Sequence, residues 1–322
     1  GCLTSCQSWR EAKTVVAEAD SLLVHKRTIL RDTAALNFAI NTLDGPLGYI
    51  FAKQDLAKAY YFMGRNFYYL NDFSTAADYY ILCDRLNPKD PLYKGRVNSC
   101  MGYLCKQDSC FEEALVFYER SSSAFKESGS EWYYAHNLLN IAEQYVNMRE
   151  YAKADSVLDI AKGYKIDSAY FARMVDVRAL ALYNQEMYDS ALVCFLRIKD
   201  TPRPIEARCY SYMKIMHCYE FLHQLDNTII YAEYIISNSK NPAYRSNAYF
   251  FLIEAEKVNQ DMQRVVNYSH LREDENRNIR TPNESCAQAT MKFKAYLNDI
   301  DYTNLIISIV AALFVVLSTG IW

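Results

Sequence analysis

Glycine and proline are scarce in this sequence, with 9 Gly and 7 Pro among 322 residues. Most of them fall between periodic apolar segments, as in an all-helical protein, because both residues disfavour the interior of a helix. An excess of basic charge is also missing, since 35 Lys and Arg face 38 Asp and Glu. This balance argues against nucleic acid as the main partner, because phosphate binding needs a basic surface.

Recognisable catalytic motifs are missing as well. The sequence contains no HExxH, GxSxG, GxGxxG or GxxxxGK[ST] pattern. The nearest approach to a ligand cluster is Cys209 with His217 and Cys218, whose spacing fits no common zinc site. They fall on a helical stripe with Tyr212 and Met216, which is typical of a core. We therefore expect no metal, no cofactor and no enzymatic activity.

The ten cysteines do not fix a redox compartment. Cys100, Cys105 and Cys110 recur every five residues, so in a helix they turn away from one another. We expect them to be small core residues. Alternatively, Cys105 and Cys110 could meet across the end of the helix.

What the sequence does contain is a repeated helical hairpin, clearest in residues 54–91. Two amphipathic segments flank a turn at 71–73, and Pro88 ends the unit. Gly64 allows the two helices to approach closely, and Ala76 and Tyr80 face back onto the first. This order of small residue, turn, small residue, aromatic and proline resembles a tetratricopeptide repeat (TPR).

Six such units can be laid over one another. The small residue of the first helix falls at Gly64, Gly102, Ala142, Ala179, Met216 and Ile253. That of the second helix falls at Ala76, Ala114, Ala154, Ala191, Thr228 and Val265. The turns begin at Asn71, Ser109, Arg149, Glu186, His223 and Gln260. Four units match well and two weakly. The resemblance implies an all-α, right-handed α-solenoid in which stacked hairpins share a continuous core.

The segments outside the repeats complete the predicted organisation. Residues 1–8 are predicted to be a tether, 9–53 an atypical capping hairpin and 54–275 the six repeats. Residues 276–301 are predicted to form a juxtamembrane helix, with a capping box and a proline at its start in 281–284. Residues 302–322 are predicted to be a transmembrane helix.

The transmembrane prediction depends on Leu305–Trp322, 18 residues without a charge. As a helix this segment would measure about 27 Å, close to the roughly 30 Å hydrocarbon core of a bilayer. The alternative is a buried last helix of the solenoid, but a terminal cap needs a polar outer face and this segment has none. The flanking charges do not orient the span.

The chain begins with Gly1-Cys2, which resembles the end of a bacterial lipobox. That resemblance implies a lipid on Cys2. The alternative is a fragment boundary that falls there by accident.

In TPR arrays the first helix of each hairpin lines the concave groove. Carried over by repeat register, this implies a ligand groove formed by Lys58, Tyr61, Arg65, Tyr68, Tyr69, Arg96, Tyr103, Lys106, Asn147, Arg173, Tyr183 and Asn184. Tyr and Arg are enriched at binding surfaces, which favours a protein or peptide partner. The alternative is that these tyrosines, among 28 in the chain, only pack hairpins together. The Lys, Asn and Arg set of chaperone-tail receptors is not found.

The whole layout resembles the envelope-anchored TPR proteins of Bacteroides-type bacteria. This resemblance implies a periplasmic, membrane-anchored array that acts as an interaction scaffold or as the sensory input of a regulator. In many relatives a cytoplasmic DNA-binding domain follows the span, but no residue here takes that role. The alternative is a surface lipoprotein that binds glycan or peptide for nutrient import, which predicts long irregular loops.

Overall fold

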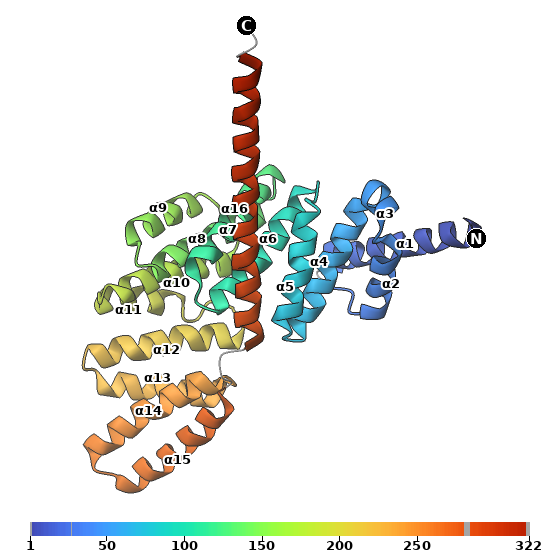
Figure 1. The fold of residues 1–322 in the computed structure, drawn as a ribbon. Coiled ribbons are helices and arrows are strands. Elements are labelled where there is room, and N and C mark those ends of the chain that lie inside the picture. Colours follow the sequence, from blue (N-terminus) through green and yellow to red (C-terminus); the bar gives the residue numbers. More distant parts are fainter. Residues whose placement is uncertain (1, 27, 280–283, 320–322) are drawn as a thin grey trace. The chain divides into compact units, whose positions relative to one another are not determined.

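The computed structural model describes the backbone of residues 2–26, 28–279 and 284–319, and the side chains of 6–23, 28–279 and 284–311. In these ranges the secondary structure consists of sixteen α-helices, and no strand is found (Figure 1). The predicted all-α class is therefore confirmed.

The helices belong to two compact units, Gly1–Ser130 with Pro282–Trp322, and Glu131–Thr281. The first unit contains α1 (Cys2–Lys26), α2 (Thr33–Leu43), α3 (Pro46–Phe51), α4 (Lys53–Tyr69), α5 (Phe73–Arg85), α6 (Pro91–Gln107), α7 (Phe111–Glu127) and α16 (Glu284–Thr319). The second contains α8 (Glu131–Asn147), α9 (Tyr151–Ala161), α10 (Ser168–Asn184), α11 (Tyr188–Ile198), α12 (Ile205–Phe221), α13 (Leu225–Asn238), α14 (Pro242–Asn259) and α15 (Met262–Asn278).

The predicted repeat register agrees with the hairpins from α4–α5 to α14–α15. All twelve positions assigned to small residues are buried, including the large or polar residues of the two weak repeats. Met216 and Thr228, for example, are almost completely inaccessible. The weak repeats are therefore ordinary hairpins whose closest approach has been filled by larger side chains.

The turns inside the hairpins share one backbone conformation. The first residue of each predicted turn is left-handed, with φ between 57° and 63°, although none of the six is glycine. In each turn the next N–H bonds the carbonyl five residues back, as Asp72 N does to Phe67 O at 3.0 Å. This is the hydrogen bond of a Schellman motif, which ends one helix so that the next can begin.

The N-terminal residues form the expected hairpin, with one addition. α1 and α2 pack together and against α4, and Ala12, Val16 and Ala19 of α1 are buried. Between α2 and α4 the chain makes a short third helix, α3, which the predicted hairpin did not include. Pro46 occupies its first position, where a proline costs no hydrogen bond.

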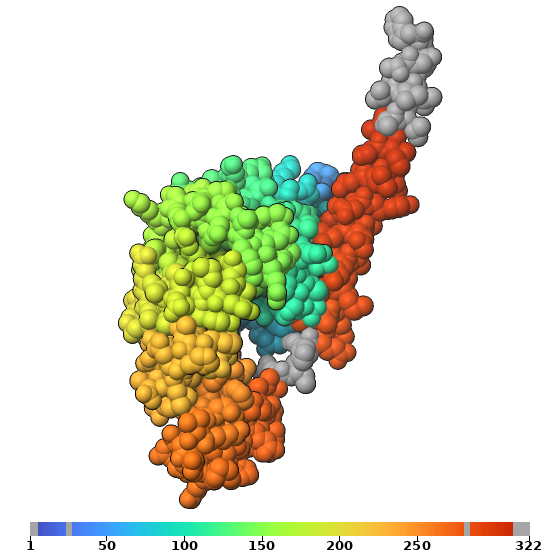
Figure 2. Space-filling model, turned by 90° about the vertical axis from the view of Figure 1, so that its left-hand side faces the viewer, coloured from blue at the N-terminus to red at the C-terminus, as the bar shows by residue number. Residues whose placement is uncertain are grey.

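The C-terminal helix α16 begins at the predicted capping box and continues without interruption through Thr319. Its first half packs against α5 and α6, where Cys286, Ala289, Phe293 and Tyr296 are buried. The predicted juxtamembrane helix is thus part of the core of the first unit. Beyond about residue 300, α16 stands clear of the other helices of that unit (Figure 1, Figure 2).

The described part of the chain contains no helix of sufficient length and apolarity to cross a bilayer. The predicted span, Leu305–Trp322, lies partly outside the described residues, as does the side chain of Cys2.

Candidate functional site

Four of the predicted groove residues lie together in the first unit. Arg65, Tyr68 and Tyr69 of α4 and Tyr103 of α6 line one cavity of about 400 Å³, together with Ser99 and Cys100 of α6. Residues separated by three or four positions share one helix face, and the contact between the Tyr68 and Tyr103 rings shows that the faces of α4 and α6 meet at this cavity. We call these four residues the Arg–Tyr cluster.

The Arg–Tyr cluster is held together by its guanidinium group. Arg65 donates a hydrogen bond of 2.8 Å to the Tyr69 hydroxyl, and its guanidinium carbon lies 5.6 Å and 5.1 Å from the ring centroids of Tyr68 and Tyr69. The Tyr68 and Tyr103 rings meet edge to face at 5.9 Å. Tyr69 and Tyr103 are 48% and 39% exposed. The cluster therefore presents a positioned cation and two accessible aromatic rings.

Three other predicted groove residues have structural roles, and their assignment to the groove is corrected. Tyr61 and Arg96 are buried, at 4% and 8% exposed, so they are not available to a ligand. Lys58 forms a 2.5 Å ion pair with Asp20, and its charge is thus already matched. The Tyr93 hydroxyl donates to the same carboxylate at 2.6 Å, which fixes α1 against α4 and α6.

The remaining predictions are scattered. Lys106 is half-buried in the last turn of α6, and Asn147 is half-buried at the end of α8. In the second unit, Arg173 donates to the Asn140 side chain at 2.5 Å and lies 3.7 Å from Glu143, both on α8. Asn184 is exposed, and its carbonyl accepts a hydrogen bond from the Tyr151 hydroxyl.

Tyr183 belongs to a separate aromatic group. Its ring contacts those of Tyr188, His217 and Phe221, and the Lys214 ammonium lies 4.5 Å from its centroid. Burial raises the pKa of Tyr183 to about 12. Tyr183 is therefore a neutral aromatic group that packs α10 against α12.

The thiols and imidazoles singled out in the sequence have ordinary structural surroundings. No group of His, Cys, Asp and Glu there could hold a metal ion. Cys209 and Cys218 are buried in the core, and burial raises the pKa of Cys218 to about 12, which keeps the thiol protonated. Cys105 and Cys110 are both free thiols.

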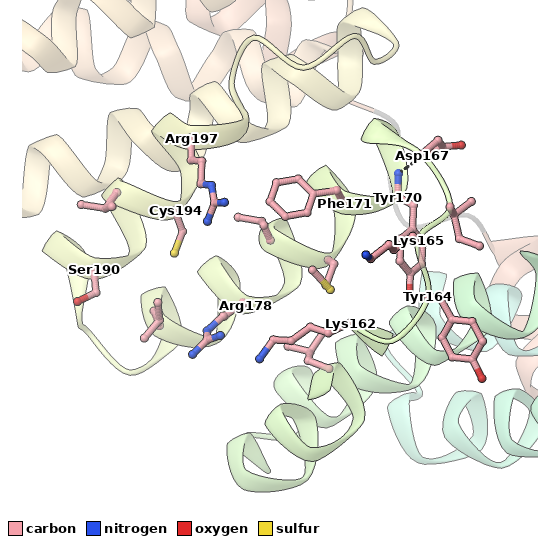
Figure 3. A pocket seen from close by; sticks show the side chains of 16 residues that line it. Lys162, Tyr164, Lys165, Asp167, Tyr170, Phe171, Arg178, Ser190, Cys194 and Arg197 are labelled. Atoms are coloured by element: carbon pink, nitrogen blue, oxygen red, sulfur yellow. Dashed lines mark hydrogen bonds between the residues drawn. The ribbon is translucent and has the colours of Figure 1, made fainter. Parts of the chain in front are cut away.

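A larger cavity, not predicted from the sequence, lies in the second unit between α9, α10 and α11 (Figure 3). Its volume is about 1020 Å³. It is lined by Leu158, Lys162, Tyr164, Lys165, Ile166, Asp167, Tyr170, Phe171, Met174, Val175, Arg178, Leu182, Ser190, Val193, Cys194 and Arg197. We call this site the α9–α11 pocket.

The charges around the α9–α11 pocket are one-sided. Among the lining residues, Lys162, Lys165, Arg178 and Arg197 are accompanied by a single carboxylate, Asp167, which accepts a 2.7 Å hydrogen bond from the Tyr170 N–H as the N-cap of α10. Lys162 forms a 2.5 Å ion pair with Asp159, which lies outside the lining. Even without Lys162, the lining cations Lys165, Arg178 and Arg197 therefore outnumber the lining carboxylate.

The repeat register does not predict the α9–α11 pocket, because the groove residue Arg173 lies on another face of α10 than the residues that line this pocket. Phe171 and Arg178 follow the same helical stripe, about two turns apart, whereas Arg173 lies on the other side. The sequence signal for this pocket is Arg178, about two helical turns after the partly exposed Phe171, followed by Arg197 on the next helix.

Solved structures with a similar fold include the APC/C hetero-tetramer Cut9–Hcn1. It is 14% identical, with a TM-score of 0.56, and the match covers 89% of this chain and 54% of that chain. The present chain thus spans about half of that protein's length. The TPR domain of P58(IPK) is also 14% identical, with a TM-score of 0.27 over 88% of this chain and 98% of that chain.

At such low identity the likeness to Cut9–Hcn1 concerns the fold alone, and it supports the TPR fold that the hairpins display. No protein-family model matches the chain, and no curated protein matches it significantly.

Proposed function

We propose that this protein is a non-enzymatic interaction module that binds a protein or peptide segment at the Arg–Tyr cluster. The observation that supports this proposal is the convergence of Arg65, Tyr68, Tyr69 and Tyr103 from two successive first helices on one partly open cavity. TPR-like arrays typically act as protein-interaction scaffolds. The bound segment carries acidic and apolar side chains.

The chemistry of the cluster explains this choice of partner. Tyrosine supplies rigid contact area at a low cost in conformational entropy, and arginine pairs with carboxylates in a defined geometry. Because Arg65 is already held by Tyr69, little further ordering is needed on binding. A second cation, the Arg31 guanidinium, lies 5.5 Å from the Tyr69 centroid and adds to the positive potential.

A peptide selection tests the proposal. Full-length protein is used to select from a random peptide display library, and the selected pool is retested on Arg65→Glu and on Lys126→Glu, an exposed cation of α7 outside the cluster. We expect selection of peptides rich in Asp, Glu and apolar residues, whose binding is lost with Arg65→Glu and retained with Lys126→Glu. Equal binding to both variants would place the site elsewhere.

We propose in addition that the array is attached to a bacterial envelope membrane through residues 305–322 and through a lipid on Cys2. In this place it would act as an interaction scaffold or as the sensory input of a regulator. The support is the row of exposed apolar side chains that follows the packed half of α16, namely Leu305, Ile306, Ile307, Ile309 and Val310. A single weak membrane anchor binds a protein to the bilayer reversibly, whereas two anchors together hold it stably. Nutrient binding by long loops is less favoured, since hairpin turns such as 70–72 are short.

Fractionation of cell membranes tests the attachment. If Cys2 carries no lipid, deletion of residues 305–322 is expected to release the array from the membrane. If Cys2 carries a lipid, release is expected only when Cys2→Ser is combined with the deletion. A full-length protein that stays in the soluble fraction without detergent would contradict both anchors.

A further inference from the structure

The two units contain equivalent troughs, one filled and one open. α6 and α10 begin at residues 91 and 168, and α7 and α11 at 111 and 188, so both pairs are offset by 77 residues. α5 and α9, which precede them, begin at 73 and 151, an offset of 78. Each residue around α6 therefore has a defined counterpart around α10.

In the first unit, α16 fills the trough between α5 and α7. The Tyr296 hydroxyl donates to the Asp84 carboxylate at 2.8 Å, and the Phe293 ring lies 5.5 Å from that of Phe117. The Cys286 thiol reaches the backbone carbonyl of Leu104 on α6, at 3.5 Å. The helix thus touches all three walls.

Further ion pairs hold α16 in this trough. The Lys294 ammonium lies 3.3 Å from the Glu113 carboxylate, and Lys292 lies 2.6 Å from Asp78. The trough is acidic at these points, and the helix that fills it is basic there.

Several counterparts of the residues around α16 line the α9–α11 pocket, whereas Ser156 and Ala181, the counterparts of Asp78 and Leu104, do not. Asp84 corresponds to Lys162, Glu113 to Ser190, and Phe117 to Cys194. Arg120, which donates to Asp84 beneath Tyr296, corresponds to Arg197. Where Phe117 is fully buried under α16, Cys194 is only half-buried, and its neighbour Val193 is 67% exposed.

We propose that the α9–α11 pocket binds an amphipathic helix of a partner protein, packed as α16 packs in the first unit, with carboxylates directed at Arg178 and Arg197. The apolar stripe of this helix covers Phe171, Val193 and Cys194. This site lies on other elements than the Arg–Tyr cluster, so the inference is independent of the function proposed for that cluster.

Charge identifies the occupant as another protein and not a second copy of α16. α16 presents Lys292 and Lys294, which would find Ser156 and Ser190 in place of Asp78 and Glu113, and Lys162 in place of Asp84. Lys292 and Lys294 of α16 would therefore lose both of their carboxylate partners, and α16 has no charge complement in this trough. Cys194, the counterpart of Phe117, also has a smaller side chain than phenylalanine. A helix laid in an apolar groove is a common mode of recognition.

A peptide derived from α16 provides a probe of known sequence. It comprises residues 284–299 with Lys292→Glu, Lys294→Glu and Tyr296→Glu, so that the packing residue Phe293 is kept and the charge is reversed. The readout on the full-length protein is alkylation of Cys194, followed by mass spectrometry of the peptide that contains it. Cys194→Ser confirms the assignment of that signal, and fluorescence titration gives the dissociation constant.

The acidic peptide is expected to slow alkylation of Cys194 several-fold. Arg178→Glu with Arg197→Glu should weaken its binding at least about tenfold, as is typical when charges at an interface are reversed. The matched control is Arg149→Glu with Lys240→Glu, two exposed cations of the same unit outside the pocket, which should leave binding unchanged.

Three results would overturn the proposal. The first is no protection of Cys194 by the acidic peptide. The second is stronger protection by the unaltered 284–299 peptide, which would identify α16 of a second copy as the occupant. The third is protection by dodecanoate but not by the peptide, which would make the pocket a site for small anionic amphiphiles.

Discussion

Tyr80 packs directly on Gly64, so that a β-carbon at residue 64 would lie 2.6 Å from Cε1 of Tyr80. The Tyr80 ring is fully buried and cannot move aside. We therefore expect Gly64→Ala to lower the free energy of unfolding by about 1–3 kcal/mol and Gly64→Leu by more, as in other overpacked cores. At Gly102 the corresponding distance to Tyr118 is 3.0 Å, so Gly102→Ala should cost less.

Urea denaturation measures both effects. Combining Gly64→Ala with Tyr80→Leu should recover part of the loss, because the two residues are in contact. If Gly64→Ala is neutral, the repeat register of the first hairpin is wrong.

The left-handed turn residues offer a stabilising change. Glu186 has φ of 61°, a conformation that costs a residue with a β-carbon about 1–2 kcal/mol. Glu186→Gly should therefore raise the free energy of unfolding by about 0.5–1 kcal/mol. Gln185 next to it has φ of −92°, and Gln185→Gly should lower stability by a similar amount. Thermal melts in which both variants shift the melting temperature in the same direction would contradict this account.

The hairpins could be predicted because their determinants are local. The turn at 71–73 and the close approach of Gly64 to Tyr80 lie within one repeat, and the same spacing recurs along the chain. The docking of α16 could not be predicted in this way. The Ser74 N–H donates to the Ser285 hydroxyl across 211 residues of sequence, and nothing in the stripe from Cys286 to Tyr296 specifies which helices it covers.

The candidate site was predicted in part for a related reason. Register assigns a residue to a helix face, and this correctly grouped Arg65 with Tyr68, Tyr69 and Tyr103. It does not say how much of that face the neighbouring helices cover. Arg96 shares the register of the groove but is enclosed by its surroundings.

His217 should make stability fall with decreasing pH. Burial, with the nearby Lys214 ammonium, lowers the pKa of His217 to about 4, whereas an unfolded histidine has a pKa of about 6.5. Above pH 6.5 both states are neutral. Between pH 6.5 and 4 the unfolded chain gains a proton that the folded protein does not, so stability is lost as the pH falls through this window.

The variant His217→Gln isolates this contribution. From pH 7 to pH 5, the wild type should lose about 1–2 kcal/mol more of its unfolding free energy than the variant. His270→Gln, which replaces an exposed histidine, is the control. Parallel urea midpoints for wild type and His217→Gln at the two pH values would show that His217 takes up its proton equally in both states.

The docking of α16 carries a prediction that also bears on the α9–α11 pocket. Phe293 is fully buried against Phe117, so Phe293→Ala should cost about 3–5 kcal/mol, as large-to-small changes in cores do. Lys294→Ala removes only a half-exposed ion pair with Glu113 and should change stability far less, because exposed ion pairs contribute little to folding. Hydrogen exchange measured peptide by peptide separates a local effect from a global one. With Phe293→Ala, the amides of α5 should exchange faster because α16 no longer covers them, while those of α9 should keep their rates. Unchanged exchange in α5 would mean that α16 does not occupy this trough. The packing of α16 could then no longer serve as the model for a helix bound in the α9–α11 pocket.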